Sequence, residues 1–378
     1  MSTAANNSLS FSDEQSMILD SAREFCRDKS SIADVRQLLS SETGFNAAVW
    51  QEMVDLGWLG LAIPEDFGGS GLGIGATVPI AECMGRQMLS TPFFSTTLAA
   101  QMLLRAGTPA QKETWLAQLA AGKIATLALL DGEDWGDEAI SATATASGDQ
   151  LVLDGEKWFV SDAVVADLFL VTVSHEGSPA LVLVERGQID DAALKPHTLI
   201  DETKRAARLQ LSGVTVPASA LLETAKTRSA LRDIRLLGAL LVAAEATGSS
   251  AACLDTVVEY LKTRKQFGKL IGSYQALKHP TVDMLCAMDS ARSFIYHAGT
   301  VVDDDELDKD AEIACRMAKA QATDALLFAG DRAVQFHGGM GFTYECDAQL
   351  YIRRAQWSQQ QFGDSSHHRK RLASLLLD

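Results

Sequence analysis

The apolar positions of this chain repeat with two different periods, and the changes of period divide the sequence into three regions. Residues 1–123 read as helices, because apolar residues recur every three or four positions between Gly and Pro breaks. From Ile124 onward, short β-rich runs alternate with Gly, Asp, Ser and Pro. The helical period returns near residue 223 and continues to the end. The order of elements is therefore α, then β, then α.

This pattern predicts an α+β protein with three domains. We expect an N-terminal helical domain over 1–123, a compact β domain of about six strands over 124–222, and a C-terminal helical domain over 223–378. In the first domain the spacing predicts helices over 46–56, 74–91, 93–106 and 108–121.

The longest predicted helix with one apolar face covers residues 232–265 and ends in a cluster of cations. Lys262, Arg264, Lys265 and Lys269 surround Phe267-Gly268, in a chain whose net charge is −16. Cations suit a helix C-terminus, so one interpretation is an ordinary helix end. The other interpretation is a binding site for a phosphate-bearing ligand.

Composition excludes several classes of function. The chain is 47% hydrophobic and 22% charged, as in ordinary globular proteins, and its acidic balance argues against nucleic acid or an anionic membrane as a partner. The first residues lack the basic and apolar segments of a signal peptide. The six cysteines have no metal spacing, and His367-His368 read as a solvated helix end, so we expect no metal. We expect a cytoplasmic protein with reduced thiols.

Three motifs resemble those of the acyl-CoA dehydrogenases, and together they span nearly the whole chain. They are LGWLGLAIPEDFGGSGLG (56–73), RKQFGKLIGSYQALK (264–278) and AVQFHGGMGFTYECDAQLYIRRAQ (333–356). The resemblance implies an N-terminal helical domain, a middle β-barrel and a C-terminal four-helix bundle. It also implies a homo- or hetero-tetramer, because the bundle mediates assembly in this family.

The resemblance further implies a chemistry and a cofactor. A carboxylate removes the α-proton of an acyl-CoA thioester, FAD accepts the β-hydride, and an electron-transfer flavoprotein reoxidises the flavin. In the family, two motifs contact the FAD of the neighbouring subunit. Here their residues are Arg264, Gln266, Phe267, Gln335, His337, Gly338 and Gly339. A Gly-Gly pair alone would indicate only a tight helix connection.

The catalytic base is missing from both positions that the family uses. Phe362 takes the place of the usual Glu, and Gly238 occupies the alternative position on the long helix. The nearest carboxylates are Asp364 and Glu245. Glu245 lies seven residues from Gly238, or ~10 Å along a helix, which favours a buried structural role for it.

The flavin-facing runs are altered as well. A Thr of the family's first run becomes Leu130, and a Ser becomes Gly136. In the second run, Trp158 is retained but Val160 replaces a hydroxyl-bearing residue. A shift of one residue would bring Ser161 into that place, so we expect Trp158 and Ser161 to contact the flavin.

Three functions remain open at this point. The chain is a base-lacking subunit of a heteromeric acyl-CoA dehydrogenase, of the kind associated with bacterial degradation of steroid or terpenoid acyl-CoAs. Alternatively it is a homomeric dehydrogenase whose base is displaced to Asp364 or Glu245. The third possibility is a flavoenzyme that does other chemistry on a CoA thioester.

Overall fold

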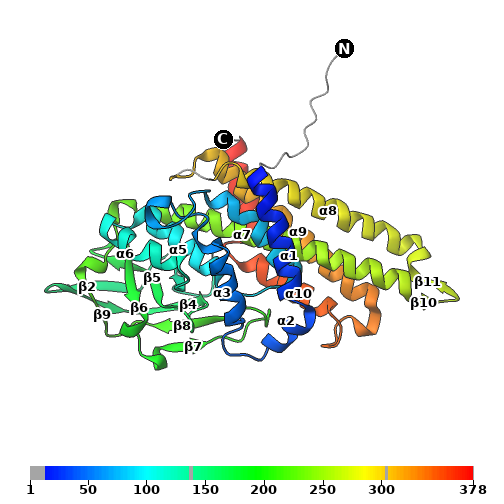
Figure 1. Ribbon diagram of the computed structural model, residues 1–378, viewed down its shortest axis with the longest axis horizontal. Coiled ribbons are helices and arrows are strands. Elements are labelled where there is room, and N and C mark those ends of the chain that lie inside the picture. Colours follow the sequence, from blue (N-terminus) through cyan, green and yellow to red (C-terminus); the bar gives the residue numbers. More distant parts are fainter. Residues whose placement is uncertain (1–12, 136–138, 303–304, 378) are drawn as a thin grey trace, which may run out of the picture.

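Helices form the N-terminal region of the computed structural model, which describes residues 13–135, 139–302 and 305–377 (Figure 1). They are α1 (Asp13–Lys29), α2 (Ile32–Leu38), α3 (Ala47–Asp55), α4 (Val78–Gln87), α5 (Phe93–Ala106) and α6 (Pro109–Ala120). The predicted helix 93–106 coincides with α5. The predicted helix 74–91 is shorter, because Ile74–Thr77 form a 3₁₀ turn and Met88 has a left-handed φ of 52° that ends α4.

Two sheets make up the middle region. The larger has the order β1-β5-β2-β3-β9, with β6 paired to β5, and the smaller has the order β4-β8-β7. A bridge between Leu130 and Trp158 joins them. The strands are β1 (Ala125–Ala128), β2 (Thr143–Ser147), β3 (Gln150–Asp154), β4 (Glu156–Ser161), β5 (Leu168–His175), β6 (Ser178–Glu185), β7 (Leu194–Pro196), β8 (Ala206–Gln210) and β9 (Val214–Pro217). Together they form the curled sheet structure expected of the barrel.

The expectation of about six strands in this region was too low, since the described residues form nine. Two runs that read as single strands each contain two, which belong to different sheets. The chain turns at Gly155 between β3 and β4 and at Gly213 between β8 and β9, with φ of 112° and 80°. Glycine adopts these left-handed angles without the steric cost that a side chain brings.

Long helices build the C-terminal region. They are α7 (Thr227–Thr263), α8 (Gln275–Gly299), α9 (Lys309–His337), α10 (Ala348–Gln360) and α11 (Ser365–Leu377). Helix α7 packs against α8, α9 and α10, and on its other side against α4 and α5. By length and composition the stretch Thr224–Thr263 would be apolar enough to cross a membrane, but 94% of its most apolar window is buried inside the protein. It is therefore the core helix that joins the N-terminal helices to the bundle.

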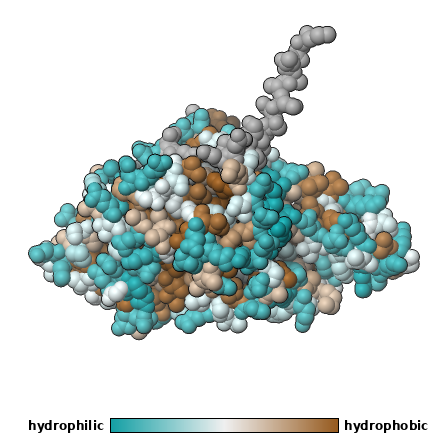
Figure 2. Space-filling view, viewed as in Figure 1, coloured by the Kyte–Doolittle hydropathy of each residue, from teal (hydrophilic) through white to brown (hydrophobic). Residues whose placement is uncertain are grey.

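The bundle extends away from the sheets and ends in a small hairpin. Strands β10 (Lys265–Gln266) and β11 (Lys269–Leu270) form this hairpin at the tip of α7, opposite the β sheets (Figure 1). Several large apolar side chains are exposed on the bundle, among them Phe267, Val282, Leu285, Met340 and Phe342. Figure 2 shows hydrophobic residues over α8 in the same part of the molecule. Exposed apolar surface of this kind is typical of an interaction face.

Candidate functional site

A cavity of about 320 Å³ opens where the N-terminal helices, the sheets and the bundle meet. Its walls are mostly apolar, with a few polar groups among them, as is usual for small-molecule sites. Helix α5 contributes Phe94, Ser95 and Leu98, and helix α7 contributes Gly238, Leu241 and Val242. The remaining walls include Thr91, Leu130, Glu133, Trp135, Trp158, Phe159, Ser161, Asp162, Lys204, Arg205, Trp357 and Phe362.

Phe362 and Gly238 are in direct contact at one wall of this cavity. A Cβ placed on Gly238 would lie only 2.4 Å from Cζ of the Phe362 ring. The same ring packs on Trp135, with ring centroids 4.2 Å apart. The aromatic ring therefore fills the space that a side chain on α7 would need.

Buried polar groups hold the loop that carries Phe362. Lys319 of α9 donates to the carbonyl of Gly363 at 2.7 Å, and His368 Nε2 lies 3.0 Å from the carbonyl of Phe362. Burial lowers the pKa of Lys319 to about 7 and that of His368 to about 3. The expectation of a solvated helix end at His367-His368 is thus wrong for His368, because α11 packs that side chain against α9.

A bulge in β4 decides which side chains of the Trp158–Ser161 run face the cavity. The pairing of β4 with β8 shifts between Lys157 and Val160, where Phe159 has a φ of 49°. As a result Trp158, Phe159 and Ser161 line the cavity, while Val160 is fully buried away from it. A one-residue shift thus places a hydroxyl-bearing residue at the cavity wall, as the sequence suggested.

Polar neighbours fix the ring of Trp158. Its indole N–H donates to Glu156 at 2.9 Å, and the guanidinium of Arg208 lies 4.5 Å from its ring centroid. His197 stacks against both Trp158 and Phe159. Burial, followed by the charge of Arg208, lowers the pKa of His197.

Glu245 belongs to a buried ion network. Its carboxylate accepts from Lys204 Nζ at 2.6 Å and from Arg354 at 2.7 Å, and it is completely buried. Arg354 also pairs with Asp201 and Thr203. Glu245 does not line the cavity. Its role is to neutralise two buried cations.

Asp364 lies outside the cavity. Its side chain is exposed, and its Oδ1 accepts from the backbone N–H of His367 at 2.7 Å, at the start of α11. A carboxylate at this position stabilises a helix N-terminus. The structure therefore brings neither Asp364 nor Glu245 to the wall that Phe362 occupies.

The sequence analysis missed Asp162, a carboxylate that does face the cavity. Its Oδ2 accepts from the hydroxyl of Ser95 at 2.6 Å, and its φ of 52° places it at the sharp end of β4. Burial raises the pKa of Asp162 to about 6, although the hydroxyl of Ser95 and the charge of Lys204 partly offset this. Its position directly after Ser161 is the signal that would have found it.

Comparison with known proteins places this arrangement in a family. The acyl-CoA dehydrogenase N-terminal domain matches residues 12–123, and the acyl-CoA dehydrogenase C-terminal domain matches residues 236–377. Acyl-CoA dehydrogenase IpdE2 of Mycobacterium tuberculosis is 30% identical over 92% of both chains. The chain belongs to the acyl-CoA dehydrogenase family. Members of this family are oxidoreductases that act on CH–CH bonds.

Solved structures of acyl-CoA dehydrogenases share the whole fold. A chain of the ChsE4-ChsE5 complex from Mycobacterium tuberculosis has a TM-score of 0.86 and 25% identity, covering 98% of this chain and 99% of that one. A variant of the Tcur3481-Tcur3483 steroid ACAD has a TM-score of 0.83 and 27% identity, covering 97% and 98%. The expected family fold is thus confirmed.

For a member of the acyl-CoA dehydrogenase family, the cavity wall is unusual at the point where the catalytic carboxylate was expected. The two positions at which the resemblance of the motifs places the base, Phe362 and Gly238, are far apart in sequence yet touch in space. Both alternatives therefore serve one point of the cavity, and neither supplies a carboxylate here. Leu130, 3% exposed, also faces this cavity without a hydroxyl, while Gly136 lies outside the described residues.

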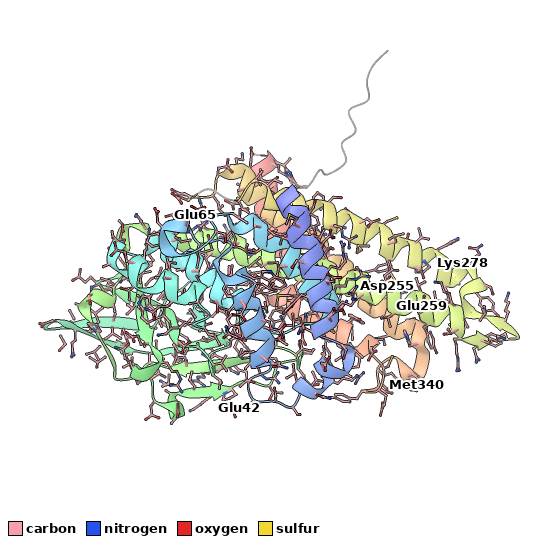
Figure 3. All side chains as sticks on the ribbon, in the orientation of Figure 1. Glu42, Glu65, Asp255, Glu259, Lys278 and Met340 are labelled. Atoms are coloured by element: carbon pink, nitrogen blue, oxygen red, sulfur yellow. The ribbon has the colours of Figure 1, made fainter. Side chains whose placement is uncertain are left out.

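The two motifs expected to contact the flavin of a neighbouring subunit lie together at the far end of the bundle. Arg264, Gln266 and Phe267 belong to the exposed hairpin, and Gln335, Gly338 and Gly339 are exposed at the end of α9. His337 stacks on Tyr260 of α7 with ring centroids 4.1 Å apart, and so joins the two motifs. Figure 3 labels Glu259, Lys278 and Met340 around this end, well away from the sheets.

This end of the bundle fits one half of a dinucleotide. Arg264 and Lys265 offer cations, and Gly338 and Gly339 leave open space where a Cβ would stand, so a ligand can approach the backbone closely there. The cavity lies at the other end of α7, near Gly238. One chain therefore cannot bring both sets of residues to a single dinucleotide.

Proposed function

We propose that this chain is a base-lacking subunit of a heteromeric, FAD-dependent acyl-CoA dehydrogenase. The observation that carries the proposal is the contact between Phe362 and Gly238, which fills the position of the base with an aromatic ring. Removal of the weakly acidic α-proton of a thioester needs a carboxylate within hydrogen-bond reach. Phe362 and Gly238 cannot accept a proton.

A second line of support is that one set of expected flavin-binding residues is retained and the other is altered. The exposed set at the tip of the bundle (Arg264, Gln266, Phe267, Gln335, His337, Gly338 and Gly339) is intact. At the cavity, Leu130 lacks the expected hydroxyl, Val160 is buried behind the wall, and Trp158 and Ser161 line it. This chain thus retains the residues that would contact the FAD of a partner subunit. FAD, when bound, supplies the acceptor for the hydride of the β-carbon.

The assembly we propose is a tetramer that contains a related, base-carrying chain. The names of two similar structures, ChsE4-ChsE5 and Tcur3481-Tcur3483, each describe a pair of chains, and the second is called a steroid ACAD. By analogy we propose a bulky steroid-like or terpenoid acyl-CoA as the substrate. An electron-transfer flavoprotein would reoxidise the flavin, and the assembly would work in the cytoplasm.

The test is to purify this chain alone and together with a homologous chain that carries the missing Glu. Each sample is read for flavin absorbance, then assayed with straight, branched and steroid-like acyl-CoAs and an artificial electron acceptor. We expect little turnover from the chain alone and clear turnover from the pair. Robust turnover by the chain alone would overturn the proposal.

The second candidate function is a homomeric dehydrogenase, and the position of Asp162 at the cavity wall favours it. Asp162 and Glu133 are carboxylates that line the cavity, whereas Asp364 and Glu245 do not. If the chain alone proves active, Asp162→Asn, Glu133→Gln, Glu245→Gln and Asp364→Asn identify the base by abolishing turnover. A flavoenzyme with other chemistry on a CoA thioester would instead bind acyl-CoA and flavin without reducing the acceptor.

A further inference from the structure

The cavity has a polar end that the dehydrogenase reaction does not use. Thr91, Ser95, Asp162 and Lys204 line this end, which we call the polar end of the cavity, while Phe94, Leu98, Leu241 and Val242 form apolar walls around it. Polar groups in a largely apolar pocket usually fix the orientation of a ligand, because each must be hydrogen-bonded or solvated.

The polar end lies well away from the contact between Phe362 and Gly238. Lys204 reaches Glu245, which stands seven residues beyond Gly238 on α7. Seven residues of α-helix correspond to ~10 Å. If the reacting carbons lie at the wall that Phe362 occupies, as the proposed function requires, a group bound at the polar end belongs to the remote part of the acyl chain.

Groups at the polar end have hydrogen-bonding capacity to spare. Ser95 donates to Oδ2 of Asp162, and Oδ1 has no partner among the described residues. The hydroxyl of Thr91 is buried and also lacks a partner there. Lys204 donates to Glu245, and its ammonium lies 4.9 Å from the ring centroid of Trp357 and 5.2 Å from that of Phe94.

The charges around the polar end select a neutral ligand group. Asp162 repels a carboxylate and Lys204 repels an ammonium, and the opposite charge of the other residue offsets the attraction that either ligand gains, so a charged group loses its hydration without a net attraction. A hydroxyl meets neither penalty, since it donates to the free oxygen of Asp162 and accepts from Lys204 or Thr91. We infer that the polar end of this cavity binds a hydroxyl group carried by the acyl substrate, remote from the thioester.

The inference rests on the proposed function, and its test measures binding rather than turnover. Trp135, Trp158 and Trp357 line the cavity, so quenching of tryptophan fluorescence reports its occupancy. The assembled complex is titrated with decanoyl-CoA, its ω-hydroxy derivative and its ω-carboxy derivative. We expect the hydroxy compound to bind about ten-fold more tightly than the other two, because one hydrogen bond to a charged group is gained.

Variants then assign the effect to the polar end. Asp162→Gly removes the carboxylate yet tolerates the left-handed φ, and Thr91→Val keeps the shape without the hydroxyl. Asp162→Gly should abolish the preference for the hydroxy compound, and Thr91→Val should reduce it. Asp66→Asn, an exposed carboxylate of the same helical region, should leave it unchanged.

Two outcomes would overturn the inference. One is equal affinity of the wild-type complex for the three ligands. The other is a preference for the hydroxy compound that survives Asp162→Gly. If that variant also loses bound flavin, Asp162 contacts the cofactor and not the substrate. Failure of the proposed function looks different: the chain then binds the hydroxy compound selectively but is active alone or forms no complex with a base-carrying homologue.

Discussion

Phe362 Cζ would lie 2.4 Å from a Cβ on residue 238, and this distance links two positions that are 124 residues apart in the sequence. Only glycine leaves room for the ring, and the ring in turn occupies the point where either position would place a carboxylate. The loss of one base position is therefore structurally coupled to the loss of the other. Restoring a carboxylate at either position alone disturbs a packed contact.

Gly238→Ala should destabilise the protein by about 1–3 kcal/mol, because the new methyl group collides with the Phe362 ring. Helix propensity acts in the opposite direction, since Ala is favoured over Gly by about 0.5–1 kcal/mol in a helix. Denaturant unfolding measures the difference. In the background of Phe362→Ala the destabilisation should disappear, and an equal cost in both backgrounds would show that the ring is not the cause. Gly187→Ala, with open space at its Cβ, is the control.

Glu245→Gln should cost about 3–5 kcal/mol of stability, because it removes the carboxylate that pairs with buried Lys204 and one of the two that pair with buried Arg354. Glu259→Gln on the same helix should change stability by less than about 0.5 kcal/mol, since that side chain is 70% exposed. Thermal unfolding of the two variants makes the comparison. A Glu245→Gln protein of wild-type stability with altered chemistry would instead assign Glu245 to the active site.

Lys319 should make the protein more stable as the pH rises above 7. Its pKa is about 7 in the folded protein and 10.5 ordinarily, so between these values the unfolded chain binds more protons than the folded one. Stability then increases with pH by up to about 1.4 kcal/mol per unit. Unfolding at pH 7, 8 and 9, values we choose within this window, should reveal the slope.

Lys319→Met is the matching variant for this pH dependence. It keeps the apolar length of the side chain and removes the ammonium, so the increase of stability above pH 7 should vanish. The variant also loses the hydrogen bond to Gly363, and it tests whether that bond holds the loop of Phe362. The same slope in both proteins would mean that another group titrates.

Arg264→Ala should weaken flavin retention in the assembled complex without unfolding the bundle. Arg264 is exposed at the end of α7, and loss of a charge-assisted contact costs about 1.5–3 kcal/mol, or roughly ten- to a hundred-fold in affinity. Flavin absorbance after gel filtration gives the readout. Lys262→Ala is the control, because Lys262 pairs with Glu259 on the helix surface. Equal flavin content in the two variants would reject the role of Arg264.

Phe362→Glu should not give this chain dehydrogenase activity by itself. The substitution supplies a carboxylate, but Leu130 still provides no hydroxyl at the cavity, and Trp135 loses its aromatic partner. Steady-state turnover of the variant with an artificial acceptor is the measurement. Activity that appears with this one change would show that the base alone separates this chain from active members of its family.

Local sequence patterns were sufficient for the order of the elements and for the family. Helix α5 was predicted residue by residue, because its apolar face is continuous and Gly107 ends it. The motifs around Arg264 and Gly338 were found for a similar reason: each is a contiguous run whose residues act together. Contacts within one element depend mainly on neighbours in the sequence.

The tertiary structure decided what the sequence left open. The bulge in β4, which brings Ser161 to the cavity and buries Val160, depends on pairing with β8, and strand register is set by distant partners. Asp162, Lys204 and Ser95 converge from three separate segments, so their spacing carries no local signal. The contact of Phe362 with Gly238 likewise exists only because α10 and α7 pack together, and packing between distant segments is a property of the folded chain alone.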